Sequence, residues 1–324
     1  MKFAIVGAGA IGGHVGAALS QGGSEVVLVA RGPHLAALRS GGITVNSPRG
    51  RLHADLEATD DIESIGPVDV VVLAVKAYQI EPIVDKLPSL FARDTAVVTM
   101  QNGIPWWYFA NNGGPYDGRR LRSLDPDGRI AATIAPERIV GSVVYSAAEL
   151  QAPGVIKHVE GTRYSLGDPG RGISARTQRI ADAFVAGGLK APVESDIRIE
   201  IWVKILGNAS FNPISALTRA TLVEMCDDPL VAPLVEEIMR ECVAVAGALG
   251  IELPITIERR IDGARRVGRH KTSMLQDLEN RRRLELDALV GAVAEIGSIA
   301  GVPTPALAHV FALAKLLERG TVAT

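Results

Sequence analysis

Residues 2–12, Lys-Phe-Ala-Ile-Val-Gly-Ala-Gly-Ala-Ile-Gly, decide the fold that this chain is expected to adopt. A short, mostly apolar run is followed by glycines at the spacing Gly-x-Gly-x-x-Gly and then by a helix-compatible stretch over 13–21. In a strand–turn–helix unit, this spacing places backbone N–H groups and the positive end of the helix dipole where they hold phosphates. We therefore expect a dinucleotide to bind at the six residues of this loop, which are Gly7, Ala8, Gly9, Ala10, Ile11 and Gly12.

Each glycine of the loop is expected to have a physical role that a side chain would disturb. Gly7 permits the sharp turn out of the strand, Gly9 leaves the backbone open to a pyrophosphate, and Gly12 lets the helix pack closely on the strand. An ordinary glycine-rich turn is the alternative. It is disfavoured because the motif stands directly between a strand and a helix.

The residue after the second expected strand, 25–30, indicates which dinucleotide binds. Sites that prefer NAD place an Asp or Glu there, about 20 residues after the glycines, to accept a hydrogen bond from the ribose 2′-hydroxyl. This chain has Arg31, whose guanidinium cannot accept that bond but matches a 2′-phosphate. We therefore expect NADPH, and the alternative is a solvated surface arginine. His34 is expected to be a surface residue of the following helix.

The bulk properties of the chain restrict the classes of protein to which it can belong. Its 324 residues are 47% hydrophobic and carry a net charge of −2, which allows two cores and disfavours a nucleic-acid partner. No apolar run is long enough to span a membrane and no signal peptide is visible, so we expect a cytoplasmic protein. Cys226 and Cys242 suit buried, reduced thiols, and the six histidines are too scattered for a metal site.

Strands and helices alternate over the first third of the chain, which predicts a parallel sheet. The apolar runs 68–75 and 95–100 are typical of buried parallel strands, and they are followed by polar residues, Lys76 and 101–103. Because ligands bind outside the carboxyl ends of such strands, we expect both polar segments to face the cofactor.

The second half of the chain changes character. Residues 139–166 are expected to form antiparallel strands that complete the same sheet, and a helix over 174–186 and a short strand near Val193 follow. We predict an α/β protein with an N-terminal Rossmann-type sheet domain that binds NADP, 1–194. An all-α domain for substrate binding and dimerisation, 195–324, is expected to follow it. A homodimer is expected because the helical part has long apolar faces.

An aromatic run, Pro105-Trp106-Trp107-Tyr108-Phe109, interrupts the alternation and precedes a glycine- and proline-rich loop. Aromatic residues make up only 4% of the chain, so their concentration here suggests a specific role. A lid over the substrate is one interpretation. An insertion that packs on the surface or at a subunit contact is the one that we favour, because exposed aromatic side chains commonly meet a partner surface.

The expected helix over 199–217 contains the residues most indicative of chemistry. Lys204, Asn208 and Asn212 stand four residues apart, so they share one face of a helix whose other residues are mostly apolar. Polar groups in such a helix are costly unless they are hydrogen-bonded or functional. A solvent-facing polar stripe is the alternative, but such stripes usually carry Glu, Lys and Arg, and Asn is a poor helix former.

The chain resembles the ketopantoate reductase family, the 2-dehydropantoate 2-reductases, almost from end to end. The shared motifs are GAGAIG at 7–12, Arg31, VKAYQ at 75–79, QNG at 101–103, WVKILGNASFNPISAL at 202–217, and TSMLQDLE and LELD within 272–287. The resemblance implies an NADPH-dependent reductase of a small 2-oxo acid, with ketopantoate and pantothenate biosynthesis as the default assignment. Several motifs in one order are more specific than any one of them.

The resemblance also implies roles for individual residues. Lys204 matches the catalytic general acid and Glu285 the acid that contacts the substrate hydroxyl. Arg31 and Lys76 match the basic pair around the 2′-phosphate. The positions that match substrate-binding residues are Asn102, which also lies beside the nicotinamide, Asn208, Asn212 and Ser273. This fits the chemistry, because a cationic lysine stabilises the oxyanion that develops at the ketone and delivers a proton.

Without the resemblance, two of these residues have simpler interpretations. Glu285 reads as an exposed charge on a helix that carries Arg281, Arg282 and Arg283. Ser273 reads as a helix N-cap within a capping box, and it can hold both roles.

The chain also departs from the family pattern. Leu222 stands where some members have a substrate-facing Asn, and Val290-Gly291 replaces an Asn-Gly pair. A different, bulkier 2-oxo acid is therefore an alternative substrate. Another alternative is a 3-hydroxyacid or opine-type dehydrogenase, but His270 and His309 have no evident acidic partner for that chemistry. An NADP(H)-sensing protein without turnover is the alternative of another class.

Overall fold

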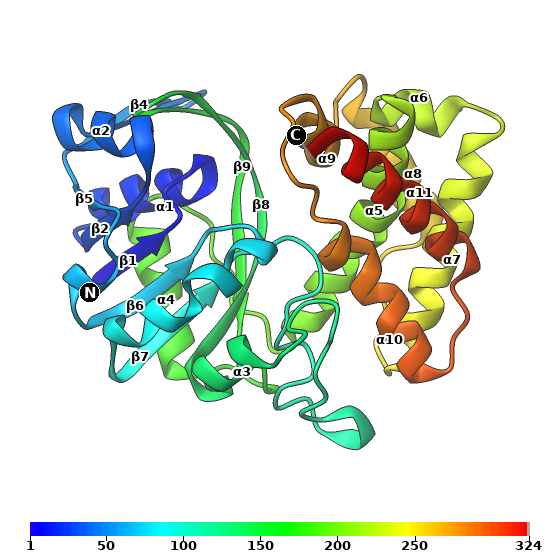
Figure 1. The fold of residues 1–324 in the computed structure, drawn as a ribbon, viewed down its shortest axis with the longest axis horizontal. Helices are drawn as coiled ribbons and strands as arrows, with labels where there is room; N and C mark the ends of the chain where they lie inside the picture. The colour runs from blue at the N-terminus through cyan, green and yellow to red at the C-terminus, as the bar shows by residue number, and fades with distance from the viewer. Residues whose placement is uncertain (323–324) are drawn as a thin grey trace. The chain divides into compact units, whose positions relative to one another are not determined.

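The computed structural model describes residues 1–322, which pack into two compact units. Unit 1 comprises Met1–Gln101, Trp106–Arg120 and Asp127–Ile197. Unit 2 comprises Asn102–Pro105, Leu121–Pro126 and, among the described residues, 198–322. Unit 1 carries a Rossmann-like, mainly parallel sheet and unit 2 is helical, so the predicted fold class is confirmed (Figure 1).

Within residues 1–322, one sheet in unit 1 has the strand order β4-β3-β9-β8-β7-β6-β1-β2-β5. The predicted antiparallel pair is confirmed as β8 and β9, and the central strands β7, β6, β1 and β2 are parallel. The strands are β1 (Lys2–Val6), β2 (Glu25–Val29), β3 (Ile43–Ser47), β4 (Gly50–Ala54), β5 (Glu57–Thr59), β6 (Val68–Leu73), β7 (Phe91–Thr99), β8 (Ile139–Ala152) and β9 (Val155–Gly167).

Helices and short 3₁₀ segments complete unit 1, and α1 lies against β8, β9 and α4. The core below α1 and α4 contains fully buried Leu19, Tyr164 and Phe184. The helices are α1 (Ala10–Gln21), α2 (Gly32–Gly41), α3 (Arg129–Thr133) and α4 (Ala175–Ala186). The 3₁₀ segments are η1 (Glu63–Ile65), η2 (Ala77–Gln79), η3 (Glu81–Leu90), η4 (Gly114–Tyr116) and η5 (Pro136–Arg138).

A polar cluster is buried between α1 and β9. The imidazole of His14 stacks on that of His158, with ring centroids 4.4 Å apart, and its Nδ1 lies 3.1 Å from the hydroxyl of Tyr164. Burial, and then the neighbouring His158 and Arg49, lower the pKa of His14 to about 4. His14 is therefore neutral at physiological pH and acts as a packing and hydrogen-bonding group.

The aromatic run packs into the interior of unit 1, which corrects the expectation of exposed aromatic side chains. Trp107 and Phe109 are buried, and the indole N–H of Trp107 donates to the hydroxyl of Thr99 at 3.0 Å. The ring of Trp107 also packs directly against Gly141 of β8. These residues therefore supply core volume, which aromatic side chains do efficiently.

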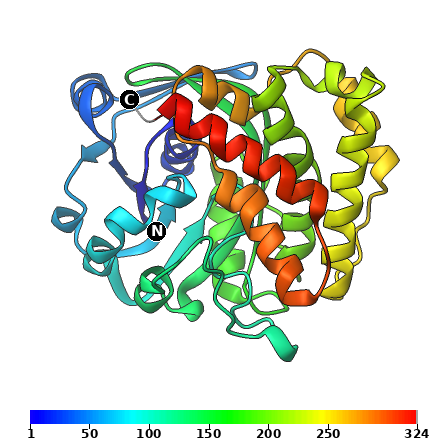
Figure 2. The same ribbon diagram turned by 45° about the vertical axis from the view of Figure 1, so that its right-hand side comes forward.

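Unit 2 is built from seven α-helices and a π-helical turn within the described residues (Figure 2). Helix α11 contacts both α7 and the π turn. The elements are α5 (Ile197–Thr218), α6 (Leu222–Asp227), α7 (Val231–Ala248), α8 (Ile257–Val267), α9 (Ser273–Glu279), the π turn η6 (Asp287–Gly291), α10 (Ala292–Ala300) and α11 (Pro305–Val322).

Glutamate side chains cap backbone N–H groups inside unit 2. Glu241 of α7 accepts hydrogen bonds from the N–H groups of Ala306 and Leu307 in the first turn of α11. Glu295 of α10 likewise accepts from Arg122 and Ser123. Each carboxylate satisfies donors that would otherwise lack a partner, and the second pair attaches the segment Leu121–Pro126 to the helices.

Among residues 1–322, no helix is both long and apolar enough to cross a membrane. The same residues contain no group of three or more His, Cys, Asp and Glu side chains placed to hold a metal ion. Both cysteines are buried and unpaired.

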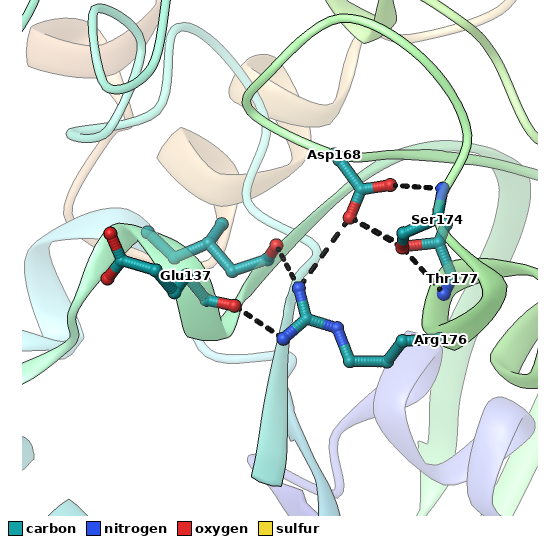
Figure 3. Close-up of polar contacts among 6 residues, drawn as sticks. Glu137, Asp168, Ser174, Arg176 and Thr177 are labelled. Carbon is teal, nitrogen blue, oxygen red and sulfur yellow. Dashed lines mark hydrogen bonds and ion pairs between the residues drawn. The ribbon is translucent and has the colours of Figure 1, made fainter.

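The start of α4 is fixed by one carboxylate (Figure 3). Asp168, one residue after β9, accepts from the N–H and hydroxyl of Ser174 at 3.0 Å and from the hydroxyl of Thr177 at 2.8 Å. It also pairs with Arg176, which donates to the carbonyl oxygens of Glu137 and Ile139. The cluster therefore joins the beginning of α4 to the beginning of β8.

Replacing Asp168 should destabilise the protein more than a surface change on the same helix. Asp168→Ala leaves three donors and one guanidinium without their acceptor, so we expect the free energy of unfolding to fall by about 2–4 kcal/mol. Urea denaturation measures this change. Asp182→Ala, an exposed residue of α4, is the control and should change stability by less than about 0.5 kcal/mol. Equal effects of the two substitutions would contradict this assignment.

Candidate active site

The glycine loop has the shape that a dinucleotide pyrophosphate requires. Gly7 has φ +98°, a conformation that glycine adopts without strain. A Cβ on Gly12 would collide with the carbonyl oxygen of Gly7, so a larger residue would push α1 away from the loop. Gly9 is exposed and a Cβ there would meet nothing within 4 Å, so the space outside the loop is open to a ligand. These residues therefore fit a bound NADP(H).

Hydrogen bonds from two neighbouring elements hold the backbone of the glycine loop. The N–H groups of Gly7 and Ala8 both donate to the carbonyl of Val29, at the end of β2. On the other side, His34 Nε2 lies 2.7 Å from the carbonyl oxygen of Ala8, and His34 Nδ1 accepts from the N–H of Gly154 at 3.0 Å. His34 is therefore not a simple surface residue, which corrects the expectation from sequence.

The two basic residues expected at the 2′-phosphate follow different strands. Arg31 directly precedes α2 and is exposed, and within residues 1–322 its side chain has no hydrogen-bond or ion-pair partner. Lys76 follows β6 and is half-buried, and its backbone N–H donates to Oε1 of Gln79. Both residues therefore follow the carboxyl end of a strand that pairs in parallel with β1: Arg31 follows β2 and Lys76 follows β6. This is where ligands bind in open parallel sheets.

Lys204 is the chemical centre of unit 2. Its ammonium donates to Oδ1 of Asn102 at 2.6 Å, although the two residues are 102 positions apart in sequence. Burial lowers the pKa of Lys204 to about 8, and the negative charge of Glu285 opposes that shift. The side chain is therefore mostly protonated at neutral pH and can release its proton at little cost.

Glu285 is buried, which overturns its interpretation as an exposed helical charge. It directly precedes the helical turn that begins at Leu286, and its own carbonyl oxygen accepts from the N–H of Leu289. The adjoining segment Asp287–Gly291 is a π turn, a local irregularity that is frequent at functional sites.

The loop that carries Asn102 is attached to this π turn. The N–H of Ile104 donates to the carbonyl of Ala288 at 2.9 Å. Gly103 has φ +91°, and a Cβ at this position would collide with the same carbonyl. The glycine therefore allows the loop to lie close to the π turn while Asn102 reaches Lys204.

The remaining predicted substrate residues are placed on two helices. Asn208 and Asn212 follow Lys204 along α5, and in the described chain neither amide has a hydrogen-bond partner although Asn212 is 95% buried. Ser273 is exposed at the first position of α9, and within residues 1–322 no hydrogen bond joins it to Lys204 or Asn102. The N-cap of α9 is Thr272, which accepts from the N–H of Leu275, so the predicted capping by Ser273 is wrong.

Sequence reasoning missed two features of these sites. The bridge made by His34 depends on Gly154, 120 residues away, and no local pattern indicates it. The π turn is also invisible in the sequence, because its residues suit an ordinary α-helix. The only available indication for His34 was its position three residues after Arg31, in the same helical turn.

A glycine loop that fits a dinucleotide, together with a half-buried lysine beside an amide and a carboxylate, defines a dinucleotide-dependent oxidoreductase. Comparison with known families is consistent with this class. The family model described as ketopantoate reductase PanE/ApbA matches residues 3–171, and the model of the C-terminal part of the same family matches residues 196–318. The chain therefore belongs to the ketopantoate reductase family, which confirms the resemblance.

Individual relatives agree with this assignment. A 2-dehydropantoate 2-reductase of Mesorhizobium japonicum is 49% identical over 323 residues, which is 99% of either chain. The crystal structure of a candidate ketopantoate reductase from Ralstonia solanacearum has a TM-score of 0.94 and 39% identity over 98% of both chains. A D-mandelate dehydrogenase solved with NADH and anilino(oxo)acetate has a TM-score of 0.84 and 27% identity over 99% of both chains.

The family defines the enzyme class of this chain. It is an NADP-dependent oxidoreductase that acts on a CH–OH group, as predicted. The predicted cofactor, NADPH, is the one that the family uses.

Proposed function

We propose that the protein reduces 2-dehydropantoate to pantoate with NADPH, the reductive step of pantothenate biosynthesis. The observation that carries this proposal is the Lys204 ammonium, which is held by Asn102 and lies within the electrostatic influence of Glu285. The reductase of Mesorhizobium japonicum, which is 49% identical, supports ketopantoate as the substrate. The small-molecule partner is thus a 2-oxo acid.

In this proposal, Lys204 is the general acid. NADPH supplies the hydride, and the ketone oxygen gains negative charge as the carbonyl carbon is reduced. The Lys204 ammonium stabilises that charge and then donates its proton to the oxygen. Asn102 orients the ammonium by accepting one of its hydrogens. Glu285 keeps the lysine protonated before the reaction and binds a hydroxyl of the substrate.

Amide and hydroxyl groups are proposed to bind the rest of the substrate. Asn208 and Asn212 extend the face of α5 that carries Lys204, and Asn212 is largely buried. A ligand that hydrogen-bonds to these amides would gain affinity and a defined orientation. Ser273 is proposed to donate to the substrate carboxylate. In unit 1 the glycine loop would hold the pyrophosphate, and Arg31 and Lys76 the 2′-phosphate.

A bulkier 2-oxo acid is a second candidate substrate. Leu222 is half-buried at the first position of α6, so an apolar side chain stands where some family members have a polar one. The similar D-mandelate dehydrogenase was solved with an aromatic oxo acid, which supports such a preference. A sensor without turnover is disfavoured, because binding alone does not need a lysine placed as a general acid.

We also propose a homodimer and a cytoplasmic location. Leu230 at the start of α7 is 85% exposed, and Leu313 and Leu316 of α11 are 57% and 66% exposed. Apolar side chains of adjacent helices that remain in contact with water favour a second copy as partner. Two buried, unpaired cysteines suit a reducing compartment.

Oxidation of NADPH, followed by absorbance against a panel of 2-oxo acids, tests the substrate and the general acid together. We expect the highest kcat/KM with ketopantoate or with a larger apolar analogue. Lys204→Ala should lower turnover by about a hundredfold or more, because a general acid contributes that much, and NADPH should still bind. Lys190→Ala, an exposed lysine of unit 1, is the control. An unchanged rate in Lys204→Ala would remove this residue from the mechanism.

The pH dependence of reduction tests the pairing of Lys204 with Glu285. Reduction needs the protonated amine, so kcat/KM should be constant below the pKa of about 8 and fall as pH rises through it. Glu285→Gln removes the charge that raises this pKa, so the fall should begin at lower pH. Initial rates between pH 6 and 10 measure the profile. An unshifted alkaline limb in Glu285→Gln would show that Glu285 does not influence the amine.

Cofactor selectivity tests the phosphate assignment of Arg31. Arg31→Ala should weaken binding of NADPH by about tenfold to a hundredfold, the usual value of a charge-assisted pair with phosphate, and leave NADH nearly unchanged. Fluorescence titration of each dinucleotide measures both dissociation constants. Arg179→Ala, an exposed arginine of α4, is the control. Equal losses for the two cofactors would contradict the assignment.

A further inference from the structure

We propose that His34 is a positioning residue that fixes the distance between the glycine loop and Arg31, and that it thereby increases selectivity for NADPH over NADH. The inference rests on the proposed function, in which the glycine loop holds the pyrophosphate and Arg31 the 2′-phosphate. His34 contacts neither phosphate in this proposal. It acts on the backbone that presents their binding groups.

The hydrogen bonds of His34 define the orientation of its ring. The N–H of Gly154 can only donate, so His34 Nδ1 must accept and therefore carries no proton. The neutral ring then has its proton on Nε2, which donates to the carbonyl oxygen of Ala8 at 2.7 Å. With both nitrogens engaged, the imidazole is a rigid bridge between the second residue of the glycine loop and a backbone amide of another segment.

The far end of this bridge is itself fixed. Gly154 lies in the turn between β8 and β9 and is buried, and its carbonyl oxygen accepts from the N–H of Thr44 in β3 at 2.8 Å. A Cβ on Gly154 would contact Ala37 of α2 at 3.2 Å, so the turn lies directly against that helix. His34 therefore links the glycine loop, through Ala8, to a turn that is bonded to β3 and packed against α2.

Arg31 is part of the same helical turn as His34. The carbonyl of Arg31 accepts from the N–H of Leu35 at 3.3 Å, and Pro33 restricts the backbone between Arg31 and His34. Leu35 and Leu38 are buried in the core of unit 1 and hold α2 in place. A displacement of the first turn of α2 relative to Ala8 would therefore break the hydrogen bond of His34, so this bond resists the displacement.

The spacing matters because NADPH is held at two places. Its pyrophosphate and its 2′-phosphate belong to one molecule, so both can be bound fully only if their two sites keep the matching separation. A fixed separation reduces the ordering cost of binding, which is the usual benefit of preorganisation. NADH has no 2′-phosphate and uses only the first site. Loss of the His34 bridge should therefore lower the affinity for NADPH more than the affinity for NADH.

Three substitutions separate the two hydrogen bonds of His34. His34→Leu removes both, His34→Gln keeps a donor where Nε2 stands, and His34→Asn keeps an acceptor where Nδ1 stands. We expect His34→Leu to raise the dissociation constant of NADPH by about tenfold, which is within the range for two lost hydrogen bonds, and that of NADH by about threefold or less. His34→Gln keeps only the bond to Ala8, so its affinity for NADPH should lie between those of wild type and His34→Leu, and His34→Asn should resemble His34→Leu.

Two further readouts distinguish positioning from general damage. The value of kcat at saturating NADPH should stay within about twofold of wild type, because His34 does not act on the reacting atoms. In an Arg31→Ala background, the 2′-phosphate site is already lost. His34→Leu should then lower the affinity for NADPH by no more than it lowers the affinity for NADH. His309→Leu, an exposed histidine of α11, is the matched control and should leave both dissociation constants unchanged.

The outcomes that overturn the inference are equally specific. Unchanged affinities in His34→Leu, equal losses for NADPH and NADH, or a His34→Gln variant as weak as His34→Leu would each contradict it. Additive effects of Arg31→Ala and His34→Leu on NADPH would do the same. Failure of the wild-type protein to bind NADPH would instead refute the proposed function. The wild-type titration therefore separates the two failures.

Discussion

An ammonium group held largely out of water is the constraint on which the candidate active site depends. Burial disfavours the charged form of Lys204, and the protein offsets that cost with the amide oxygen of Asn102 and the charge of Glu285. Burial lowers the pKa of Lys204 to about 8, and the charge of Glu285 opposes that shift. The π turn contacts both groups that surround the ammonium. Gly103, next to Asn102, lies directly against the carbonyl of Ala288, and the N–H of Leu289 donates to the carbonyl of Glu285.

The glycine loop of unit 1 has a different physical requirement, which is to present backbone N–H groups to a phosphate. A dinucleotide phosphate needs N–H groups that point outward from a loop with little side chain, and such a loop must be held by hydrogen bonds to its remaining backbone groups. Val29 accepts from two of its N–H groups, and His34 donates to one of its carbonyls. The proposed cofactor site in unit 1 therefore depends on backbone geometry, whereas the candidate site in the helical unit depends on the electrostatics of one side chain.

The sequence was sufficient to predict features that depend on local pattern. The strand–glycine–helix unit, the antiparallel pair after residue 139 and the common face of Lys204 and Asn208 all follow from periodicity over a few residues. Features created by distant contacts could not be predicted. The bridge of His34 and the burial of Glu285 depend on segments that approach only after folding, and aromatic composition alone does not distinguish a core residue from a surface one, as Trp107 illustrates.

The path of the chain through unit 2 has a consequence for protein engineering. The segments Asn102–Pro105 and Leu121–Pro126 belong to the helical unit, although the chain on either side of them builds the sheet. A single cut near residue 198 would therefore give a fragment without the amide that accepts from Lys204 and without the N–H groups that Glu295 caps. Exchange of the helical unit between relatives must transplant these two short inserts together with the helices.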